Sequence, residues 1–231
     1  MSKPKIFIAC DTSDPKKLDK IIRQSRTTKL QISYKIGLEF FLSPKGRNFV
    51  SKLNKKEIFL DLKLNDIPNT CVAAINSLKD LKKISYLTVH VSGGLDMLNA
   101  IKKASKKINR KLKILGVTIL TSFSNSSIKK VGHTRSIKEL VKKQAALAKQ
   151  AKLDGVVCSG YEVKFLKKIC KNMEIITPGI RLVGDNKGDQ KRVMTPKQAF
   201  KNGATSIVMG RSLTDGNIKN NIKNLINSLY Y

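Results

Sequence analysis

Short apolar runs recur along the chain, and segments with helical spacing of apolar residues lie between them. Runs of this length bounded by Gly, Pro or charged residues are typical of buried strands. The runs that predict strands are Lys5–Cys10, Ile32–Ile36, Glu57–Lys63, Tyr86–Val91, Leu112–Leu120, Gly155–Cys158, Glu174–Thr177 and Ser206–Met209.

The helical segments place apolar residues three or four positions apart. They are Asp14–Arg26, Glu39–Leu53, Pro68–Lys82, a helix ending near Lys107, Ser136–Leu153, Glu162–Cys170, and a closing helix on Ile218, Ile222, Leu225 and Ile226. Alternating strands and helices without a Pro/Gly-rich linker predict parallel strands with helical crossovers. A closed (β/α)₈ barrel forming one domain over residues 1–231 is the most economical arrangement. The alternative, a doubly wound open sheet, favours a G-x-G-x-x-G turn after the first strand, where this chain has Cys10-Asp11-Thr12-Ser13.

The third run leads into an unusual stretch, residues 57–70, with the sequence EIFLDLKLNDIPNT. In an extended strand Asp61 and Lys63 point to the same side, and charges at the end of a buried strand are costly unless they are paired or used. Asp66 comes where Pro68 must take the chain out of the sheet, so it can point elsewhere. Taken alone, the stretch fits a solvated salt bridge as well as it fits a functional site.

Polar residues collect at the predicted carboxyl ends of the strands, where (β/α)₈ barrels have their active sites. They are Asp11, Lys35, Asp61, Lys63, His90, Thr118 to Thr121, Ser159, Pro178 to Arg181, Gly210 and Arg211. A single member can be structural; Asp11, for example, could cap a helix. The whole ring favours an active site.

The loops after the last two strands are suited to phosphate. The loop that opens with Pro178-Gly179-Ile180-Arg181 is long, polar and Gly-containing, so Arg181 or Gln190 could close over a ligand. Gly210-Arg211-Ser212 precedes a helix, where backbone N–H groups and a guanidinium can bind a dianion. Barrels often bind phosphate in these two loops.

The chain carries 46 Lys and Arg against 16 Asp and Glu, a formal net charge of +30. Such an excess is found in nucleic-acid-binding proteins and also on Lys-rich enzymes. The lysines are scattered in pairs, without a basic block, interleaved aromatics or an RNA-binding signature. The pattern therefore favours an enzyme that meets an anionic small substrate, and we expect no nucleic-acid partner.

Four cysteines and two histidines show no metal-like spacing, so we expect no metal and assign no role to His133. The N-terminal apolar segment is too short for a signal peptide, and no window reaches membrane-spanning length. We expect a soluble, cytoplasmic protein with reduced thiols and no membrane partner.

Several motifs together resemble the orotidine 5′-monophosphate decarboxylases of the bacterial type, from end to end of the chain. The resemblance rests on Asp11, Lys35, the run Asp61-Leu62-Lys63-Leu64-Asn65-Asp66-Ile67-Pro68-Asn69-Thr70, Thr88-Val89-His90 with Gly93-Gly94, Leu120-Thr121-Ser122, Thr177-Pro178-Gly179-Ile180-Arg181, Gly188-Asp189-Gln190-Lys191-Arg192-Val193 and Val208-Met209-Gly210-Arg211-Ser212. D-x-K-x-x-D alone is moderately specific, and the downstream motifs make the combination strong.

The resemblance implies removal of CO₂ from C6 of orotidine 5′-monophosphate, the last step of de novo synthesis of uridine monophosphate, without a cofactor. It implies a homodimer with shared sites and a catalytic set of Lys35, Asp61, Lys63 and Asp66, with Lys63 as proton donor and Asp66 supplied by the partner subunit. The implied substrate contacts are Asp11 and Lys35 on the ribose, Asp61 on the substrate carboxylate, Thr121 on the pyrimidine, Thr70 of the partner subunit on the ribose–phosphate region, Arg181, Gln190, Gly210 and Arg211 on the phosphate, and Pro178.

Two alternatives remain. The 3-keto-gulonate 6-phosphate decarboxylases and hexulose-phosphate synthases share D-x-K-x-x-D but use Mg²⁺ held by further carboxylates. Here Lys35 stands where an acid would be expected, and Ile67-Pro68-Asn69-Thr70 replaces their usual continuation. The second alternative is a basic nucleic-acid-binding barrel with a vestigial site, supported by the net charge alone.

Overall fold

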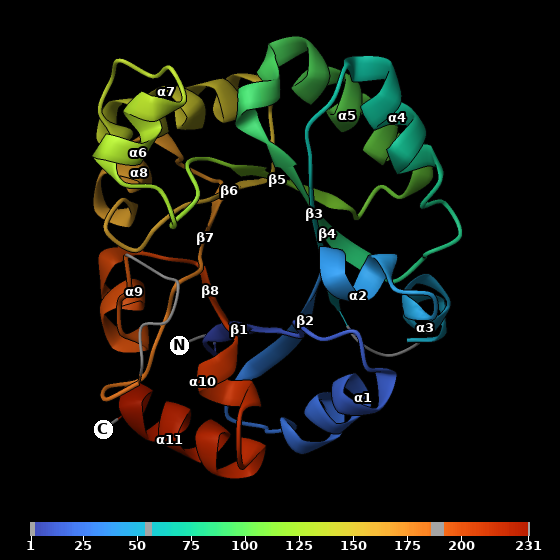
Figure 1. Ribbon diagram of the computed structural model, residues 1–231, viewed down its shortest axis with the longest axis vertical. Helices are drawn as coiled ribbons and strands as arrows, with labels where there is room; N and C mark the ends of the chain where they lie inside the picture. The colour runs from blue at the N-terminus through green and yellow to red at the C-terminus, as the bar shows by residue number, and fades with distance from the viewer. Residues whose placement is uncertain (1–2, 54–56, 186–191, 231) are drawn as a thin grey trace.

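The computed structural model describes residues 3–53, 57–185 and 192–230, and its strands close into a parallel barrel (Figure 1). Each strand pairs with the next in chain order, and β1 pairs with β8 to complete the ring. The strands are β1 (Lys5–Ala9), β2 (Gln31–Gly37), β3 (Ile58–Leu64), β4 (Ile84–His90), β5 (Lys113–Val117), β6 (Gly155–Val157), β7 (Glu174–Thr177) and β8 (Ser206–Met209). The predicted (β/α)₈ barrel is confirmed.

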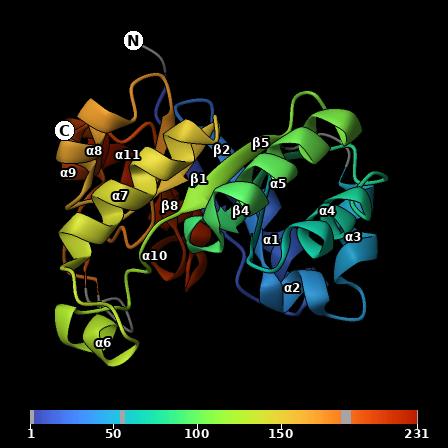
Figure 2. The same ribbon diagram turned by 90° about the horizontal axis from the view of Figure 1, so that it is seen from above.

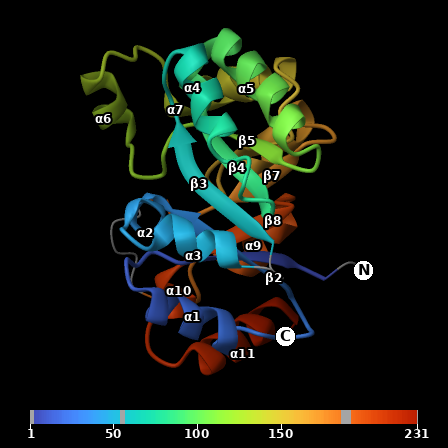
Figure 3. The same ribbon diagram turned by 90° about the vertical axis from the view of Figure 1, so that its right-hand side faces the viewer.

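Helices surround the barrel and connect its strands (Figure 1). They are α1 (Pro15–Gln24), α2 (Leu38–Leu42), α3 (Gly46–Lys52), α4 (Pro68–Asn76), α5 (Gly94–Ile108), α6 (Asn125–Lys130), α7 (Ile137–Gln150), α8 (Val163–Ile169), α9 (Pro196–Asn202), α10 (Arg211–Thr214) and α11 (Ile218–Tyr230), with a 3₁₀ turn, η1 (Val91–Gly93), before α5. Figures 2 and 3 show that α6 projects away from the barrel, whereas α5 and α7 lie along it.

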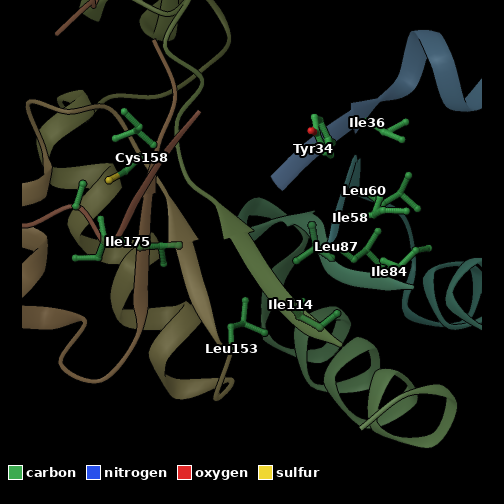
Figure 4. Packing of buried hydrophobic residues seen from close by; sticks show 14 of the residues in the cluster. Tyr34, Ile36, Ile58, Leu60, Ile84, Leu87, Ile114, Leu153, Cys158 and Ile175 are labelled. Atoms are coloured by element: carbon green, nitrogen blue, oxygen red, sulfur yellow. The ribbon is translucent and has the colours of Figure 1, made fainter. Parts of the chain in front are cut away.

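In every strand but β2, alternate residues belong to two different apolar layers, as the period of two requires. Ile6 and Ile8 of β1 pack outward in the large cluster between strands and helices, part of which Figure 4 shows. Phe7 belongs to the second cluster, where its ring meets Phe59 at 5.1 Å and Tyr86 at 5.2 Å in edge-to-face geometry. Both layers are apolar, so the strands read as almost continuous hydrophobic runs.

The amino ends of the strands are closed by a polar network. Lys5 Nζ lies 2.9 Å from Glu57 Oε2 and donates to the Tyr86 hydroxyl at 2.7 Å. Tyr86 in turn donates to Glu174 at 3.1 Å, and Lys113 pairs with the same carboxylate. Charged groups fill this end of the barrel.

The helix predicted over Glu39–Leu53 is wrong in one respect, because the structure divides it into α2 and α3. Ser43 between them is extended, with φ −65° and ψ 155°. The residue before a proline avoids the helical region, and Pro44 follows directly. The break brings Gly46 so close to α2 that a Cβ there would lie 1.7 Å from the Phe40 carbonyl oxygen.

The segment between β7 and β8, predicted as a polar loop, also contains a helix, α9. Thr195 caps it by accepting from the Gln198 N–H, and Pro196 occupies its first turn. The spacing of Thr195 and Gln198 is the sequence signature of a capping box. This short helix carries only two buried residues, so its apolar positions are too few to predict a helix from their spacing.

Candidate active site

A cavity of about 300 Å³ opens at the carboxyl ends of the strands. Its size suits a small ligand. It is lined by Ala9, Asp11, Lys35, Phe59, Asp61, Lys63, Val117, Ile119, Leu120, Thr121, Ser122, Val157, Cys158, Pro178, Gly179, Arg181, Val208, Gly210 and Arg211. Residues from strands on opposite sides of the ring therefore meet in one place, at the end where the sequence predicts a site.

Four charged side chains form a continuous series in this cavity. Lys35 Nζ lies 3.0 Å from Asp11 Oδ1 and 3.4 Å from Asp61 Oδ2. Lys63 Nζ donates to the same Asp61 oxygen at 2.9 Å. Asp61 thus lies between two ammonium groups, and its side chain is only 10% exposed.

The two buried members of the series hold each other in their charged forms. Burial acts to raise the pKa of the Asp61 carboxyl, but Lys35, Lys63 and a hydrogen bond from Thr88 outweigh it, and the pKa is lowered. Burial acts to lower the pKa of Lys35, but Asp61 and Asp11 outweigh it, and that pKa is raised. The cavity therefore favours the carboxylate form of Asp61 and the ammonium form of Lys35, and both groups can interact with a charged ligand.

Asp61 and Lys63 do meet, but regular strand alternation is not the reason. The pairing of β3 with β4 is irregular between Leu60 and Leu64, which face Leu87 and Val89. Lys63 within this bulge has φ 50°, a left-handed conformation that is rare outside glycine. The bulge redirects the chain so that the Lys63 ammonium turns back toward Asp61.

Two arginines come from the loops predicted to bind phosphate. Arg181 follows β7, and Gly210 and Arg211 follow β8. These three residues line the cavity. The Arg181 backbone N–H donates to the Met194 carbonyl at 3.0 Å. This bond connects the start of the loop after β7 to the segment before α9. Among the described residues the buried Ser212 hydroxyl has no hydrogen-bond partner.

A sequence model of the orotidine 5′-phosphate decarboxylase / HUMPS family matches residues 4–221. The chain belongs to this family. It is 42% identical over 225 residues to the orotidine 5′-phosphate decarboxylase of a Wolbachia from Brugia malayi, covering 96% of each chain. It is 37% identical over 217 residues to that of Idiomarina loihiensis, covering 93% of this chain and 92% of the relative. The crystal structure of the Lactobacillus acidophilus orotidine 5′-phosphate decarboxylase superposes with a TM-score of 0.83 at 30% identity over the full length of both chains.

The family resemblance inferred from the motifs is therefore confirmed. Most of the predicted site residues lie together around the cavity. The residues that line it are Asp11, Lys35, Asp61, Lys63, Thr121, Pro178, Arg181, Gly210 and Arg211. Gln190 lies outside the described residues.

Asp66 and Thr70 do not line the cavity of their own barrel. Asp66 is exposed on the turn between β3 and α4, where its Oδ1 accepts the Ile67 N–H at 2.7 Å, and Thr70 is exposed in the first turn of α4. Ile67 itself is 67% exposed. That Asp66 and Thr70 serve a neighbouring subunit stays a prediction.

Two cavity residues that carry a hydroxyl or a thiol are not among the predicted site residues. Cys158 lies after β6 and Ser122 after Thr121, and both contact the cavity. Burial raises the pKa of the Cys158 thiol well above its usual value, so the thiol stays neutral. His90 is partly buried beside the charged series; burial and the Lys63 ammonium lower its pKa against the opposing effect of Asp61.

A buried ion pair fixes the loop that carries Thr121. Arg192 pairs with Glu162, which is 5% exposed, and donates to the Leu120 carbonyl at 3.1 Å. Glu162 also accepts the Ser159 N–H at 2.9 Å. Arg192 thus joins three loops at the rim, after β5, β6 and β7.

Arg192→Met is therefore expected to lower the free energy of unfolding by about 3 kcal/mol, because it leaves the Glu162 carboxylate buried without its cation. Urea denaturation followed by circular dichroism measures the change. Arg23→Met is the matched control, since the Arg23–Asp19 pair is 66% and 51% exposed and should contribute less than about 1 kcal/mol. Equal losses in the two variants would contradict the structural role of Arg192.

No metal cluster or membrane span is found in the described part of the chain. Over residues 3–53, 57–185 and 192–230, no group of three or more His, Cys, Asp or Glu side chains could hold a metal ion. None of the helices described above is both long and apolar enough to cross a lipid bilayer.

Proposed function

We propose that this protein converts orotidine 5′-monophosphate to uridine 5′-monophosphate by decarboxylation at C6, the last step of de novo pyrimidine synthesis. The observation that carries the proposal is the series Asp11, Lys35, Asp61 and Lys63 within one cavity, with contacts of 3.0, 3.4 and 2.9 Å. The relatives named above, at 37% and 42% identity, support the same substrate.

The cavity offers a different chemical group to each part of this substrate. Arg181 and Arg211 supply guanidinium groups for the phosphate, with Gly210 and Gln190 as further contacts. Asp11 and Lys35 bind the ribose hydroxyls. Thr121, which is buried at the wall of the cavity, contacts the pyrimidine, and Pro178 is a further substrate contact.

In the proposed reaction the bond between C6 and the carboxylate breaks, CO₂ leaves, and the electron pair stays on C6. Lys63 stabilises this carbanion through its ammonium group and then transfers a proton to C6. No carbonyl is conjugated with the carbanion, so electrostatic stabilisation and binding energy from the phosphate and ribose must lower the barrier. We expect no cofactor to take part.

In this proposal Asp61 faces the substrate carboxylate. Two such charges ~4 Å apart at an effective dielectric of 20 repel by about 4 kcal/mol. Enzymes typically lower barriers by roughly 8–23 kcal/mol, so repulsion supplies a minority of the effect. Lys63 and the phosphate contacts supply more in this proposal.

The working unit in this proposal is a homodimer with shared sites. Asp66 and Thr70 are exposed and lie outside the cavity of their own barrel, so each would enter the site of the neighbouring copy. Large exposed apolar side chains follow the site strands: Leu38 and Leu42 on α2 are 48% and 73% exposed, and Ile67 is 67% exposed. A second copy would bury this surface.

Loss of the orotate ring absorbance on incubation with orotidine 5′-monophosphate tests the function. We expect turnover that persists in excess EDTA and does not rise on addition of Mg²⁺. Activity abolished by EDTA and restored by Mg²⁺ would instead identify the metal-dependent sugar-phosphate branch of the family. A nucleic-acid-binding barrel with a vestigial site would show no turnover at all.

A further inference from the structure

Thr88 is a fully buried residue of β4 that does not line the cavity. Its hydroxyl nevertheless contacts two members of the charged series. Thr88 Oγ1 accepts the Lys63 backbone N–H at 2.9 Å and donates to Asp61 Oδ1 at 2.8 Å. One hydroxyl thus links the backbone of one candidate catalytic residue to the side chain of another.

The position of Thr88 in the sheet explains why Lys63 depends on it. Between Leu87 and Val89, Thr88 is the single β4 residue opposite the bulge that holds Asp61, Leu62 and Lys63. The bulge disrupts the ladder there, so the Lys63 N–H needs another acceptor. A non-glycine residue with φ 50° persists only where its surroundings over-determine it, and the Thr88 hydroxyl supplies one such constraint.

The same hydroxyl also sets the rotation of the Asp61 carboxylate. Because an Oγ lone pair accepts the Lys63 N–H, the single hydroxyl proton is directed to Asp61 Oδ1. The other oxygen, Oδ2, is then turned toward Lys63 Nζ at 2.9 Å and Lys35 Nζ at 3.4 Å. Thr88 therefore controls both ends of the Asp61–Lys63 pair.

We propose that Thr88 is a positioning residue for the decarboxylation, which holds the Lys63 backbone and the Asp61 carboxylate in the one geometry that aims the Lys63 ammonium into the cavity. The inference rests on the proposed function. A valine in this place keeps the shape but removes both hydrogen bonds, whereas a serine keeps the hydroxyl.

Thr88→Val is expected to lower kcat about 10- to 100-fold, because it removes one hydrogen bond to a carboxylate and one between neutral groups. The KM of Thr88→Val should stay within about threefold of that of the unmodified protein, since no substrate contact is lost. Thr88→Ser should keep kcat within about threefold of the unmodified protein. Thermal unfolding identifies any variant that fails to fold, and Thr88→Ala replaces the valine variant in that case, with the same expected loss.

A kcat unchanged in Thr88→Val, a rise in KM alone, or an equal loss in Thr88→Ser would overturn the proposal. A measurement without substrate separates this inference from the function itself. The ¹³C carboxyl resonance of Asp61 should titrate at higher pH in Thr88→Val, where Lys35, Lys63, Asp11 and His90 still surround it. An unchanged titration contradicts the role of Thr88, whereas absence of turnover in the unmodified protein contradicts the proposed function.

Discussion

Lys63→Ala should lower kcat for orotidine 5′-monophosphate by at least about 10³-fold. A positioned general acid contributes about 10²–10⁴-fold, and a preorganised charge beside a developing anion adds a further large factor. In the proposed mechanism Lys63 does both. Its ammonium is also the closer of the two cations on Asp61 Oδ2, at 2.9 Å against 3.4 Å for Lys35. Initial rates of absorbance loss at saturating substrate measure the change in kcat.

Binding of uridine 5′-monophosphate to Lys63→Ala should stay within about tenfold, because the phosphate contacts are on other loops. Isothermal titration calorimetry measures this. Lys138→Ala on α7 is the matched control; it removes one exposed positive charge away from the cavity and should leave kcat unchanged. Appreciable turnover by Lys63→Ala would remove the proposed proton donor from the mechanism.

The barrel could be predicted because its strands are apolar on both faces. Ile6 and Ile8 pack outward while Phe7 packs inward, so the first strand is a continuous apolar run in the sequence. The ends of the helices were harder to predict. They depend on local events such as the extended Ser43 before Pro44, which an apolar stripe does not show.

The residue types of the site were predictable for a related reason. Lys35 and Asp61 are charged residues inside strands that otherwise carry buried apolar side chains, so they stand out from the pattern. Thr88 does not, because threonine is common in strands and its hydroxyl gives no signal until its partners are known. The conformation of Lys63 was equally hidden, since a period of two assumes that β3 is regular.

The role of Asp66 cannot be read from one chain, because an exposed carboxylate has a function only when its partner is present. The sequence placed it beyond the turn, and the structure shows it outside the cavity of its own barrel. Dimerisation decides between a solvated surface residue and a site residue supplied to a neighbour. That choice has a direct test.

Equal mixing of an Asp61→Ala variant with an Asp66→Ala variant is expected to restore about one quarter of the activity of the unmodified protein. Random exchange makes about half of the dimers hybrid, and in each hybrid one site carries both substitutions while the other is intact. Each variant alone should be nearly inactive. Native mass spectrometry with one tagged variant establishes the exchange, and the absorbance assay measures the recovery.

The matched control mixes Asp61→Ala with Lys63→Ala. Both residues line the cavity of their own barrel, so every hybrid site has one substitution and the mixture should stay inactive. If subunits exchange but the mixture of Asp61→Ala and Asp66→Ala recovers no activity, Asp66 does not serve the site of the neighbouring subunit. Recovery confined to that mixture would show that the turn after β3 works across the subunit boundary, while Asp61 and Lys63, a few residues earlier, work within it.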